Sequence, residues 1–348
     1  MIVALSFKSP EPRHRFHLTK EKSATSRHFT KRNVPQSRPG RLLLASWNIA
    51  NLGVQGRTPN ARKLIAHILQ RFDLIAIQEV KDDFRDFTDV LSHMGGSFDY
   101  VMTDTAGNTE RLAFIYRKSK VSPANLFGEV ALRDREYPKR TVKVKWTDRQ
   151  KRERIDTFPK LRFRPFDRNP FIGSFVSGAV RFTLVNVHLY FGGFGNSRKK
   201  EERKKYARRV LEIYAMSRWA DRRFDKDSTY DKDIILLGDM NVPAMNQRES
   251  TYKALVKFGW KPLGYTSKTG GSNLGNDKSY DQMVFAPGTI GGRVLNFGVF
   301  DFDNAVFRPL WNRISSDLSH TRAVGLFNRH VKHHLSDHRP LWIELNIS

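Results

Sequence analysis

The chain has 348 residues, 39% hydrophobic and 12% aromatic, enough apolar surface for a folded core and too much for wholesale disorder. Lysine and arginine number 61 against 35 acidic residues, and this net charge of +26 favours a polyanionic partner over a merely basic surface, because basic proteins gain affinity by releasing counterions from phosphate chains. There is no cysteine, which excludes disulfides, thiolate zinc sites and cysteine nucleophiles.

Residues 1–41 are rich in cations, with scattered proline and serine and no apolar period. We therefore expect a flexible basic N-terminal arm ahead of a single domain over residues 42–348. A solvated tail is favoured for this arm over a nucleic-acid contact or a targeting segment. No apolar run approaches the ~20 residues of a membrane span, so we expect no membrane span and a cytoplasmic protein.

From residue 42 onwards, apolar runs alternate with amphipathic segments, which favours one α/β domain. Apolar runs of strand length predict buried strands at 42–48, 73–80, 111–116, 181–189, 233–239, 281–286 and 340–347. Apolar residues at helical spacing predict helices at 60–72, with Asn60 as N-cap, at 84–94 and, strongly basic, at 198–222. Alternating cations and apolar residues between 135 and 164 indicate a basic hairpin.

Polar side chains recur where the apolar runs end. The set consists of Asn48, Glu79, His188, Asp239, Asn241, Asp281, Asp337 and His338. Any one of them also suits a turn, but their recurrence favours one shared site, because open α/β folds gather functional groups at strand ends. Carboxylate and amide oxygens suit Mg²⁺ or Mn²⁺, and histidines beside carboxylates suit proton transfer near neutral pH. With cations nearby, the set predicts phosphoester hydrolysis by an activated water.

The motifs WNIANLG, IQEV, NVHL, GDMN, YDQMVF and SDHRPLWIEL follow in the order and approximate spacing of the endonuclease/exonuclease/phosphatase superfamily. The chain most resembles the deoxyribonuclease-I-like branch of that superfamily, over nearly all residues after the arm. The resemblance implies a four-layered α/β sandwich, in which two mixed β-sheets pack together between outer helices. It also implies a divalent-metal phosphodiesterase that cuts with water and forms no covalent intermediate.

By position, the resemblance implies that Asn48, Glu79 and Asp337 surround a Mg²⁺ ion, with Mn²⁺ as a substitute. Asp239 and Asn241 would meet the attacking water, the phosphate or a second metal. One metal or two therefore stays open.

The resemblance also implies two carboxylate–histidine pairs. Glu110 would orient His188, and Asp281 would pair with His338, so that each acid fixes the tautomer of its histidine. Arg168 matches the arginine that holds the phosphate. Whether His188 or Asp239 is the general base stays open.

Three positions bear on the substrate. Ala50 and Asn108 stand where relatives carry a DNA-contacting arginine and an aromatic residue, which argues against minor-groove contacts of the deoxyribonuclease-I type. Lys81 keeps a cation at a groove-contacting position and is expected to bind substrate.

Three functions compete. We favour a monomeric nuclease acting on nucleic acid, DNA ahead of RNA and by internal cleavage, because a long polyanion can use the whole basic surface. The second function is hydrolysis of inositol phosphates, lipid phosphates or other small phosphoesters. The third is nucleic-acid binding by a decayed enzyme, which the presence of every motif residue disfavours.

Three remaining features have predictions of their own. The glycine-rich segment 191–196 is expected to be a mobile turn. The histidines between 330 and 334 are interpreted as surface residues in preference to a transition-metal site. Trp47 and Trp342 are interpreted as core residues.

Overall fold

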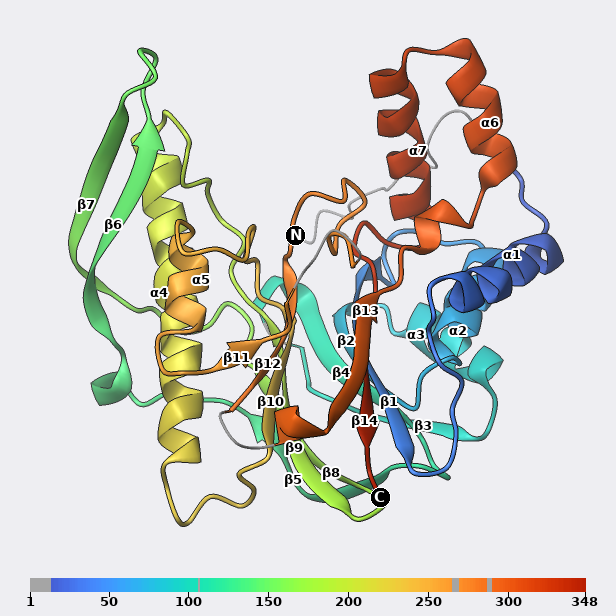
Figure 1. The fold of residues 1–348 in the computed structure, drawn as a ribbon, viewed down its shortest axis with the longest axis horizontal. Helices are drawn as coiled ribbons and strands as arrows, with labels where there is room; N and C mark the ends of the chain where they lie inside the picture. Colours follow the sequence, from blue (N-terminus) through green and yellow to red (C-terminus); the bar gives the residue numbers. More distant parts are fainter. Residues whose placement is uncertain (1–13, 106, 265–268, 287–289) are drawn as a thin grey trace.

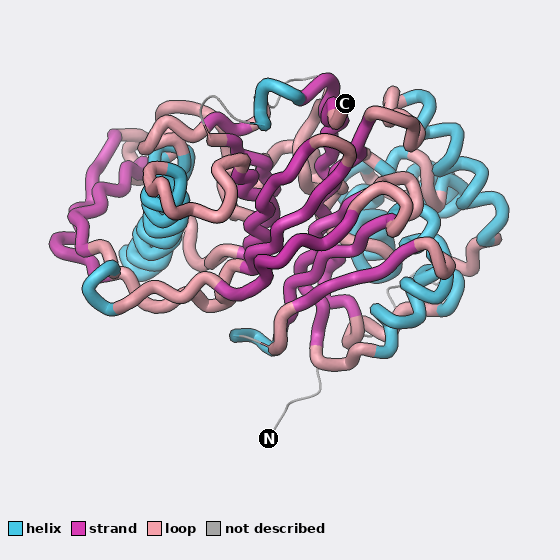
Figure 2. The backbone as a smooth tube through the Cα atoms, turned by 90° about the horizontal axis from the view of Figure 1, so that it is seen from below, coloured by secondary structure: helices cyan, strands magenta, loops and turns pink. Residues whose placement is uncertain are grey.

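The computed structural model describes residues 14–105, 107–264, 269–286 and 290–348. Two six-stranded mixed sheets lie face to face, with helices outside (Figures 1 and 2). The first sheet contains, in spatial order, β13 (Val294–Val299), β14 (Leu341–Asn346), β1 (Arg41–Leu52), β2 (Leu74–Lys81), β4 (Glu110–Arg117) and β3 (Phe98–Met102). The second contains β11 (Lys261–Pro262), β12 (Asp281–Phe285), β10 (Ile234–Asp239), β9 (Val180–His188), β8 (Phe171–Ser177) and β5 (Ser122–Glu129).

The outer face of each sheet packs against its own helices. The first sheet shares a core with α1 (Leu18–Lys31), α2 (Pro59–Leu69), α3 (Arg85–Met94), α6 (Arg308–Asp317) and α7 (His320–His334). The second shares a core with α4 (Lys200–Phe224) and α5 (Ser250–Leu255). The expected four-layered α/β sandwich is confirmed, and each predicted strand and helix is present within a few residues. None of the helices in the described ranges is long and apolar enough to cross a membrane.

The residues of β1 from 42 to 45 are all apolar because both faces of the strand are buried there. Leu42 and Leu44 point into the core between the two sheets, whereas Leu43 and Ala45 point into the core beneath the helices. Successive side chains of a strand alternate between faces, so a stretch that is covered on both sides favours apolar residues at successive positions. Burying each leucine contributes about 1.5–3 kcal/mol.

Parallel pairing brings the polar strand ends to one edge of the sandwich. β1 runs parallel to β2, with Asn48 opposite Gln78, and β9 runs parallel to β10, with His188 opposite Asp239. Asp239 is also opposite Asp281 of the antiparallel β12. Residues from distant segments therefore become neighbours through strand register alone.

The basic hairpin predicted between residues 135 and 164 is present as β6 (Lys139–Thr147) and β7 (Glu153–Arg162). Its apolar face, formed by Val142, Val144 and Phe158, packs on α4. In Figure 1 the hairpin rises at one side of the molecule and the α6–α7 pair rises at the other side, with the site-bearing strand ends between them.

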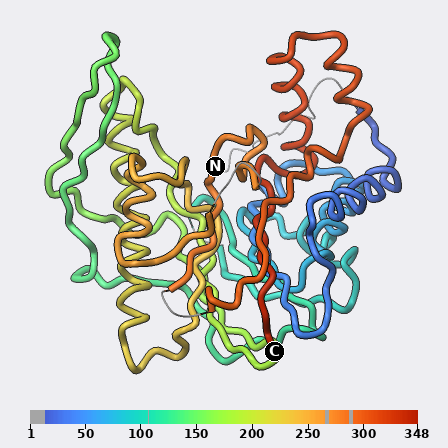
Figure 3. The backbone as a smooth tube through the Cα atoms, in the orientation of Figure 1, coloured from blue at the N-terminus to red at the C-terminus, as the bar shows by residue number. Residues whose placement is uncertain are grey.

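The flexibility expected of residues 1–41 does not hold for α1. Phe29 is buried and stacks on Phe300 with 4.0 Å between ring centroids, and His28 lies 2.9 Å from a carboxylate oxygen of Asp301. Figure 3 shows α1 in blue close to the red α6. These partners lie more than 270 positions away in the chain, so no local apolar period announces the helix. Residues 1–13 of the predicted arm lie outside the described residues.

Two smaller predictions are corrected. α2 is capped by Thr58, whose hydroxyl accepts a hydrogen bond from the Ala61 amide at 3.3 Å, and not by Asn60; Pro59 then occupies the first helical position, where its missing N–H costs nothing. The histidines between 330 and 334 are buried rather than exposed, because α7 packs its last turn against Phe307. Trp47 and Trp342 are core residues, as predicted.

Candidate functional site

A cleft of about 550 Å³ opens at the edge where the strands deliver their polar ends. Seven of the eleven predicted site residues line it: Glu79, Arg168, His188, Asp239, Asn241, Asp337 and His338. The other four lie behind them: Asn48, Glu110 and Asp281 form hydrogen bonds with Glu79, His188 and His338, and Lys81 pairs with Glu110. The structure therefore brings the whole predicted set together.

Glu110, at the start of β4, holds His188, at the end of β9. Its Oε2 accepts a hydrogen bond from Nδ1 of His188 at 2.9 Å, and its Oε1 accepts one from Lys81 at 2.7 Å. Burial alone would raise the pKa of Glu110, but the hydrogen bond from His188 and the charges of His188, Arg168 and Lys81 outweigh burial and lower the pKa to about 2. Glu110 is therefore ionised at neutral pH and fixes the proton of His188 on Nδ1.

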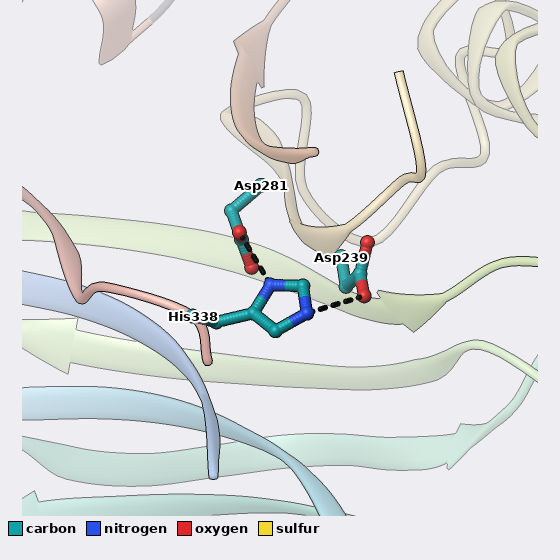
Figure 4. Close-up of side chains that lie close together, drawn as sticks. All are labelled: Asp239, Asp281 and His338. Atoms are coloured by element: carbon teal, nitrogen blue, oxygen red, sulfur yellow. Dashed lines mark hydrogen bonds and ion pairs between the residues drawn. The ribbon is translucent and has the colours of Figure 1, made fainter. Parts of the chain in front are cut away.

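A second carboxylate–histidine pair faces the first across Asp239. Nδ1 of His338 donates to Asp281 at 2.9 Å, and its Nε2 lies 3.7 Å from Oδ2 of Asp239 (Figure 4). His188 approaches the same oxygen from the other side, with Nε2 at 3.6 Å. Burial alone lowers the pKa of His338, but the charges of Asp281 and Asp239 outweigh burial and raise that pKa well above its usual value.

Asn48 bridges the two sheets at the floor of the cleft. Its Nδ2 donates to Oε1 of Glu79 at 2.9 Å and to Oδ2 of Asp239 at 3.2 Å, while its Oδ1 accepts from the amide of Ala50. Glu79 sits at an irregularity in the β2–β4 pairing with a φ of 63°, a conformation that costs a non-glycine residue about 1–3 kcal/mol. The amide of Asn51 stabilises this conformation by donating to the second Glu79 oxygen at 2.8 Å.

The donor set around Asn48 fits a magnesium ion. One carboxylate oxygen of Glu79 and one of Asp239 lie close together, because both accept a hydrogen bond from the side-chain amide of Asn48. Mg²⁺ prefers hard oxygen ligands of this kind. Five carboxylates gather at the site, from Glu79, Glu110, Asp239, Asp281 and Asp337, and the ion pairs of Lys81, Arg168 and Lys332 involve only Glu110 and Asp337 among them. The buried guanidinium groups of Arg57 and Arg209 act on Glu79, Asp337 and Asp239 at longer range. A divalent cation between Glu79 and Asp239 would add positive charge directly against these two carboxylates.

The ligand atoms of Asp239, Asp281 and His338 also lie within 4.8 Å of one another. Two of these three groups are already joined by the hydrogen bond from His338 to Asp281, and a nitrogen ligand suits Mg²⁺ less well than oxygen does. The side of the cleft with Glu79 is therefore the better position for magnesium.

Asp337 is placed next to a lysine. Nζ of Lys332, one turn from the end of α7, lies 2.5 Å from Oδ2 of Asp337. Although burial would raise the pKa of Asp337, the charges of His338 and Lys332 outweigh it and lower that pKa. Lys332 was not among the predicted site residues, because it lies in the histidine-rich segment 330–334 that was expected at the surface.

The two predicted substrate-binding cations have partners within the protein. Nε of Arg168 donates to the carbonyl oxygen of His188 at 2.9 Å and Nη2 to that of Leu189 at 3.3 Å, so Arg168 braces the end of β9 while it lines the cleft. Lys81 is an ion-pair partner of Glu110. Both cations therefore support the Glu110–His188 pair.

The turn after β10 depends on backbone geometry that its residues permit. Gly238 has a φ of +132°, and a Cβ at this position would lie 2.1 Å from the carbonyl oxygen of Val187. Asn241 adopts a φ of 54°, a left-handed conformation that asparagine tolerates well, and donates from Nδ2 to the carbonyl of Leu189 at 2.7 Å. The GDMN motif thereby fastens β10 to the loop that follows His188.

Two further polar residues position the site and were missed from sequence. The hydroxyl of Ser336 donates to the carbonyl of Asn48 at 2.6 Å and accepts from the amide of His338 at 2.9 Å. Arg209 of α4 is buried and donates to the carbonyl of Asn241 at 3.3 Å. Ser336 lies inside the SDHRPLWIEL motif but was not predicted as a site residue, and Arg209 is one of many cations in the basic helix predicted at 198–222.

Known proteins resemble this chain in sequence and in fold. A protein of Thioalkalivibrio sp. (strain K90mix) named Deoxyribonuclease is 27% identical over 239 residues, which are 64% of this chain and 53% of that protein, so the chain spans about half the length of this relative. Among solved structures, humanized D. rerio TDP2 with 14 mutations is 14% identical with a TM-score of 0.48, covering 88% of this chain and 99% of that one. The Bacteroides thetaiotaomicron VPI-5482 mannosyl-6-phosphatase Bt3783 is 17% identical with a TM-score of 0.46, covering 87% and 99%.

The sequence pattern of the Endonuclease/Exonuclease/phosphatase family matches residues 45–338, which include every predicted site residue. This match covers well over half of the chain and agrees with the resemblance carried by the six motifs. The chain belongs to the Endonuclease/Exonuclease/phosphatase family.

Proposed function

We propose that this protein is a Mg²⁺-dependent phosphodiesterase that hydrolyses nucleic acid, DNA ahead of RNA, by internal cleavage with water. One observation carries the proposal: Nε2 of His188 and Nε2 of His338 approach the same oxygen of Asp239 at 3.6 and 3.7 Å, and each is held from behind by its own carboxylate. Two oriented imidazoles around one carboxylate suit the transfer of a proton from water and the stabilisation of charge on a phosphate.

The two histidines have different environments, which supports different roles. With its proton fixed on Nδ1 by Glu110, His188 offers Nε2 as a base, alone or together with Asp239. His338 faces three carboxylates, of Asp281, Asp239 and Asp337, and is kept protonated, so it suits donation to a phosphate oxygen. Water then attacks phosphorus, its proton passes to the base, and the bond from phosphorus to the leaving oxygen breaks.

Glu79, Asn48 and Asp337 would hold the metal. When bound there, Mg²⁺ would neutralise charge on the phosphate oxygens and stabilise the developing negative charge of the transition state. Mn²⁺ accepts the same oxygen ligands and is expected to substitute.

The basic surface supports a long polyanionic substrate. The net charge is +26, and the β6–β7 hairpin, which packs on α4, exposes cations on both strands: Lys139, Arg140, Lys143, Lys145, Arg154, Lys160 and Arg162. A small phosphoester would contact only the cleft, whereas a polynucleotide reaches the hairpin as well. The relative named Deoxyribonuclease supports DNA as the substrate.

The proposal is tested by incubating supercoiled plasmid with the protein and Mg²⁺, with EDTA in place of metal, and with the His188→Ala variant. His320→Ala is the matched control, because His320 is exposed at the start of α7. We expect nicking that requires metal and His188 and tolerates loss of His320. Hydrolysis of inositol phosphates without any cleavage of DNA or RNA would overturn the proposal and favour the small-phosphoester function, and metal-independent DNA binding without hydrolysis of either would favour a binding protein.

A further inference from the structure

Two exposed aromatic side chains stand at the mouth of the catalytic cleft. Phe191 and Phe194 are 46% and 57% exposed, and their rings meet edge to face with centroids 6.0 Å apart. Phe191 lines the same cleft as His188 and Asp239. Large apolar side chains facing solvent lose the free energy of burial, so such a pair beside reacting groups indicates a binding surface.

Tyr280 continues the aromatic surface inwards. Its ring lies 6.1 Å from the ring of Phe191 and 6.2 Å from that of His338, between centroids. The four rings form a series from solvent to the catalytic histidine. A flat ligand group resting on Phe191 would therefore be attached close to a phosphate at His338.

The loop that carries the two phenylalanines is held in place, although its glycines predicted a mobile turn. The buried guanidinium of Arg209 donates to the carbonyl oxygens of Phe191, Gly192 and Gly193 and lies 4.9 Å from the centroid of the Phe191 ring. Gly193 has a φ of +74°, and a Cβ there would lie 2.1 Å from the carbonyl of Glu202, so the loop packs directly on the backbone of α4. A preorganised loop loses little entropy when a ligand binds.

The start of the loop is tied to the catalytic residues. The amide of Leu189 donates to the carbonyl of Asp239 at 2.9 Å, and Asn241 donates to the carbonyl of Leu189 at 2.7 Å. Phe191 follows two residues later. The aromatic pair is thus positioned by the same backbone that positions the phosphate site.

We propose that Phe191 and Phe194 form a stacking platform for an unpaired nucleobase next to the scissile phosphodiester. The inference rests on the proposed nuclease function and narrows its substrate class to single-stranded or locally unpaired nucleic acid. In an intact duplex each base already stacks on its neighbours, so its faces are covered. An unpaired base has a free face, and an aromatic ring binds it without regard to sequence.

The test is a cycle of two changes measured by kcat/KM. One change is Phe191→Ala with Phe194→Ala, and the other replaces the bases flanking the cleaved bond of a single-stranded oligonucleotide by abasic tetrahydrofuran residues. Each change alone should lower kcat/KM roughly five- to a hundredfold, as expected for loss of a base–aromatic stack. Combined, they should lower it no further than either one does. Effects that multiply, or the absence of an effect, would overturn the platform.

Two control variants separate stacking from a general loss of structure. Phe297→Ala removes an exposed phenylalanine of β13, outside the cleft, and should leave kcat/KM unchanged. Phe191→Tyr with Phe194→Tyr should restore most of the activity, because tyrosine keeps the aromatic face.

A binding measurement distinguishes failure of the platform from failure of the nuclease function. The His188→Ala protein in EDTA should quench the fluorescence of 2-aminopurine within a single strand, and quenching should disappear when both phenylalanines are also replaced. Plasmid nicking without such quenching would retain the nuclease and overturn the platform. Quenching that depends on the phenylalanines in a protein that cuts no nucleic acid would retain the platform and overturn the nuclease.

Discussion

Nδ1 of His188 and Oε2 of Glu110 lie 2.9 Å apart, although 78 positions separate the two residues in the chain. β9 and β4 belong to different sheets, so this hydrogen bond spans the interface of the sandwich. It directs Nε2 of His188 toward the carboxylates of Asp239 and Glu79, at 3.6 and 3.8 Å. The packing of the two sheets and the orientation of a catalytic candidate therefore depend on each other.

Glu110→Gln should lower kcat about a hundredfold with little change in KM, as a magnitude typical of disturbed acid–base catalysis. The amide keeps the size of the side chain but removes the charge that stabilises the protonated imidazole, and it leaves Lys81 without its anionic partner. Steady-state kinetics on a plasmid or oligonucleotide substrate would measure this.

The matched control is Glu201→Gln, an exposed glutamate in the first turn of α4, which should retain full activity. If Glu110→Gln kept the wild-type kcat while His188→Ala abolished activity, the orienting role of Glu110 would be wrong.

Lys143→Gln should weaken DNA binding, because the hairpin is expected to contact phosphates. It should also reduce the slope of the logarithm of the binding constant against the logarithm of the salt concentration by about one. Lys143 is exposed on β6, in the hairpin that rises at one side of the molecule (Figure 1). Kd would be measured between about 50 and 200 mM salt with the inactive His188→Ala protein.

Lys118→Gln serves as the control for the hairpin, because Lys118 follows β4 at the end of the strand opposite Glu110. Equal slopes for the two variants would show that the cations act only through net charge and that the hairpin makes no local contact.

That the candidate site residues lie together was predictable from sequence, because most of them lie at or near strand ends. Apolar runs identify buried strands, and the polar residue that ends such a run lies at the end of the strand for His188 and Asp239. Asn48 lies within β1, where the pairing of β1 with β2 becomes irregular. Their mutual distances were not predictable, since they depend on how two sheets with no local sequence connection pack face to face.

Residues whose role depends on distant partners were read wrongly or not at all. Arg209 belongs to the strongly basic helix predicted at 198–222, where nothing distinguishes it from its neighbours, but it lies buried against the loop after β9. α1 had no apolar period and folds through contacts of Phe29 and His28 with the segment near residue 300. Composition and periodicity describe neighbouring residues in the chain. The contacts of Arg209 and of α1 join segments that are far apart in the chain, so these patterns do not predict them.

Glu212→Gln should stabilise the protein at pH 8 far more than at pH 5. Glu212 is buried in α4 and accepts a hydrogen bond from the amide of Tyr190 at 3.0 Å, and burial raises its pKa to about 7. In the unfolded chain Glu212 loses its proton near its ordinary pKa of 4.5, whereas in the folded protein it keeps the proton up to about pH 7. The free energy of unfolding of the wild type therefore falls as the pH rises from 4.5 to 7, by on the order of 2–3 kcal/mol.

Glutamine keeps the oxygen that accepts from Tyr190 and carries no charge, so the variant escapes this loss. Denaturant unfolding at the two pH values would measure the difference in the free energy of unfolding. A gain that is the same at pH 5 and pH 8, or equally present in Glu201→Gln, would contradict the assignment.

The buried histidines of α7 should make the protein sensitive to acid. Neither ring nitrogen of His330 has a hydrogen-bond partner within the described part of the chain, and its ring lies 4.4 Å from that of His334, between centroids. Burial, together with the charges of neighbouring histidines, lowers the pKa of His330 to about 4 and that of His334 to about 3. The folded protein therefore keeps both rings neutral where the unfolded chain protonates them.

The sign follows from this difference. The stability contributed by the neutral rings is complete above about pH 6.5 and is lost as pH falls toward 4, by on the order of 2 kcal/mol for each histidine. His330→Leu cannot take up a proton, so its stability should fall less between pH 7.5 and pH 5 than that of the wild type, as measured by denaturant unfolding. His320→Leu, at the exposed start of the same helix, should follow the wild type. Because α7 leads directly into Ser336 and Asp337, acid should first unfold the part of the site that these two residues form. If the stability of His330→Leu and of the wild type fell equally with pH, His330 would not be the cause of the acid sensitivity.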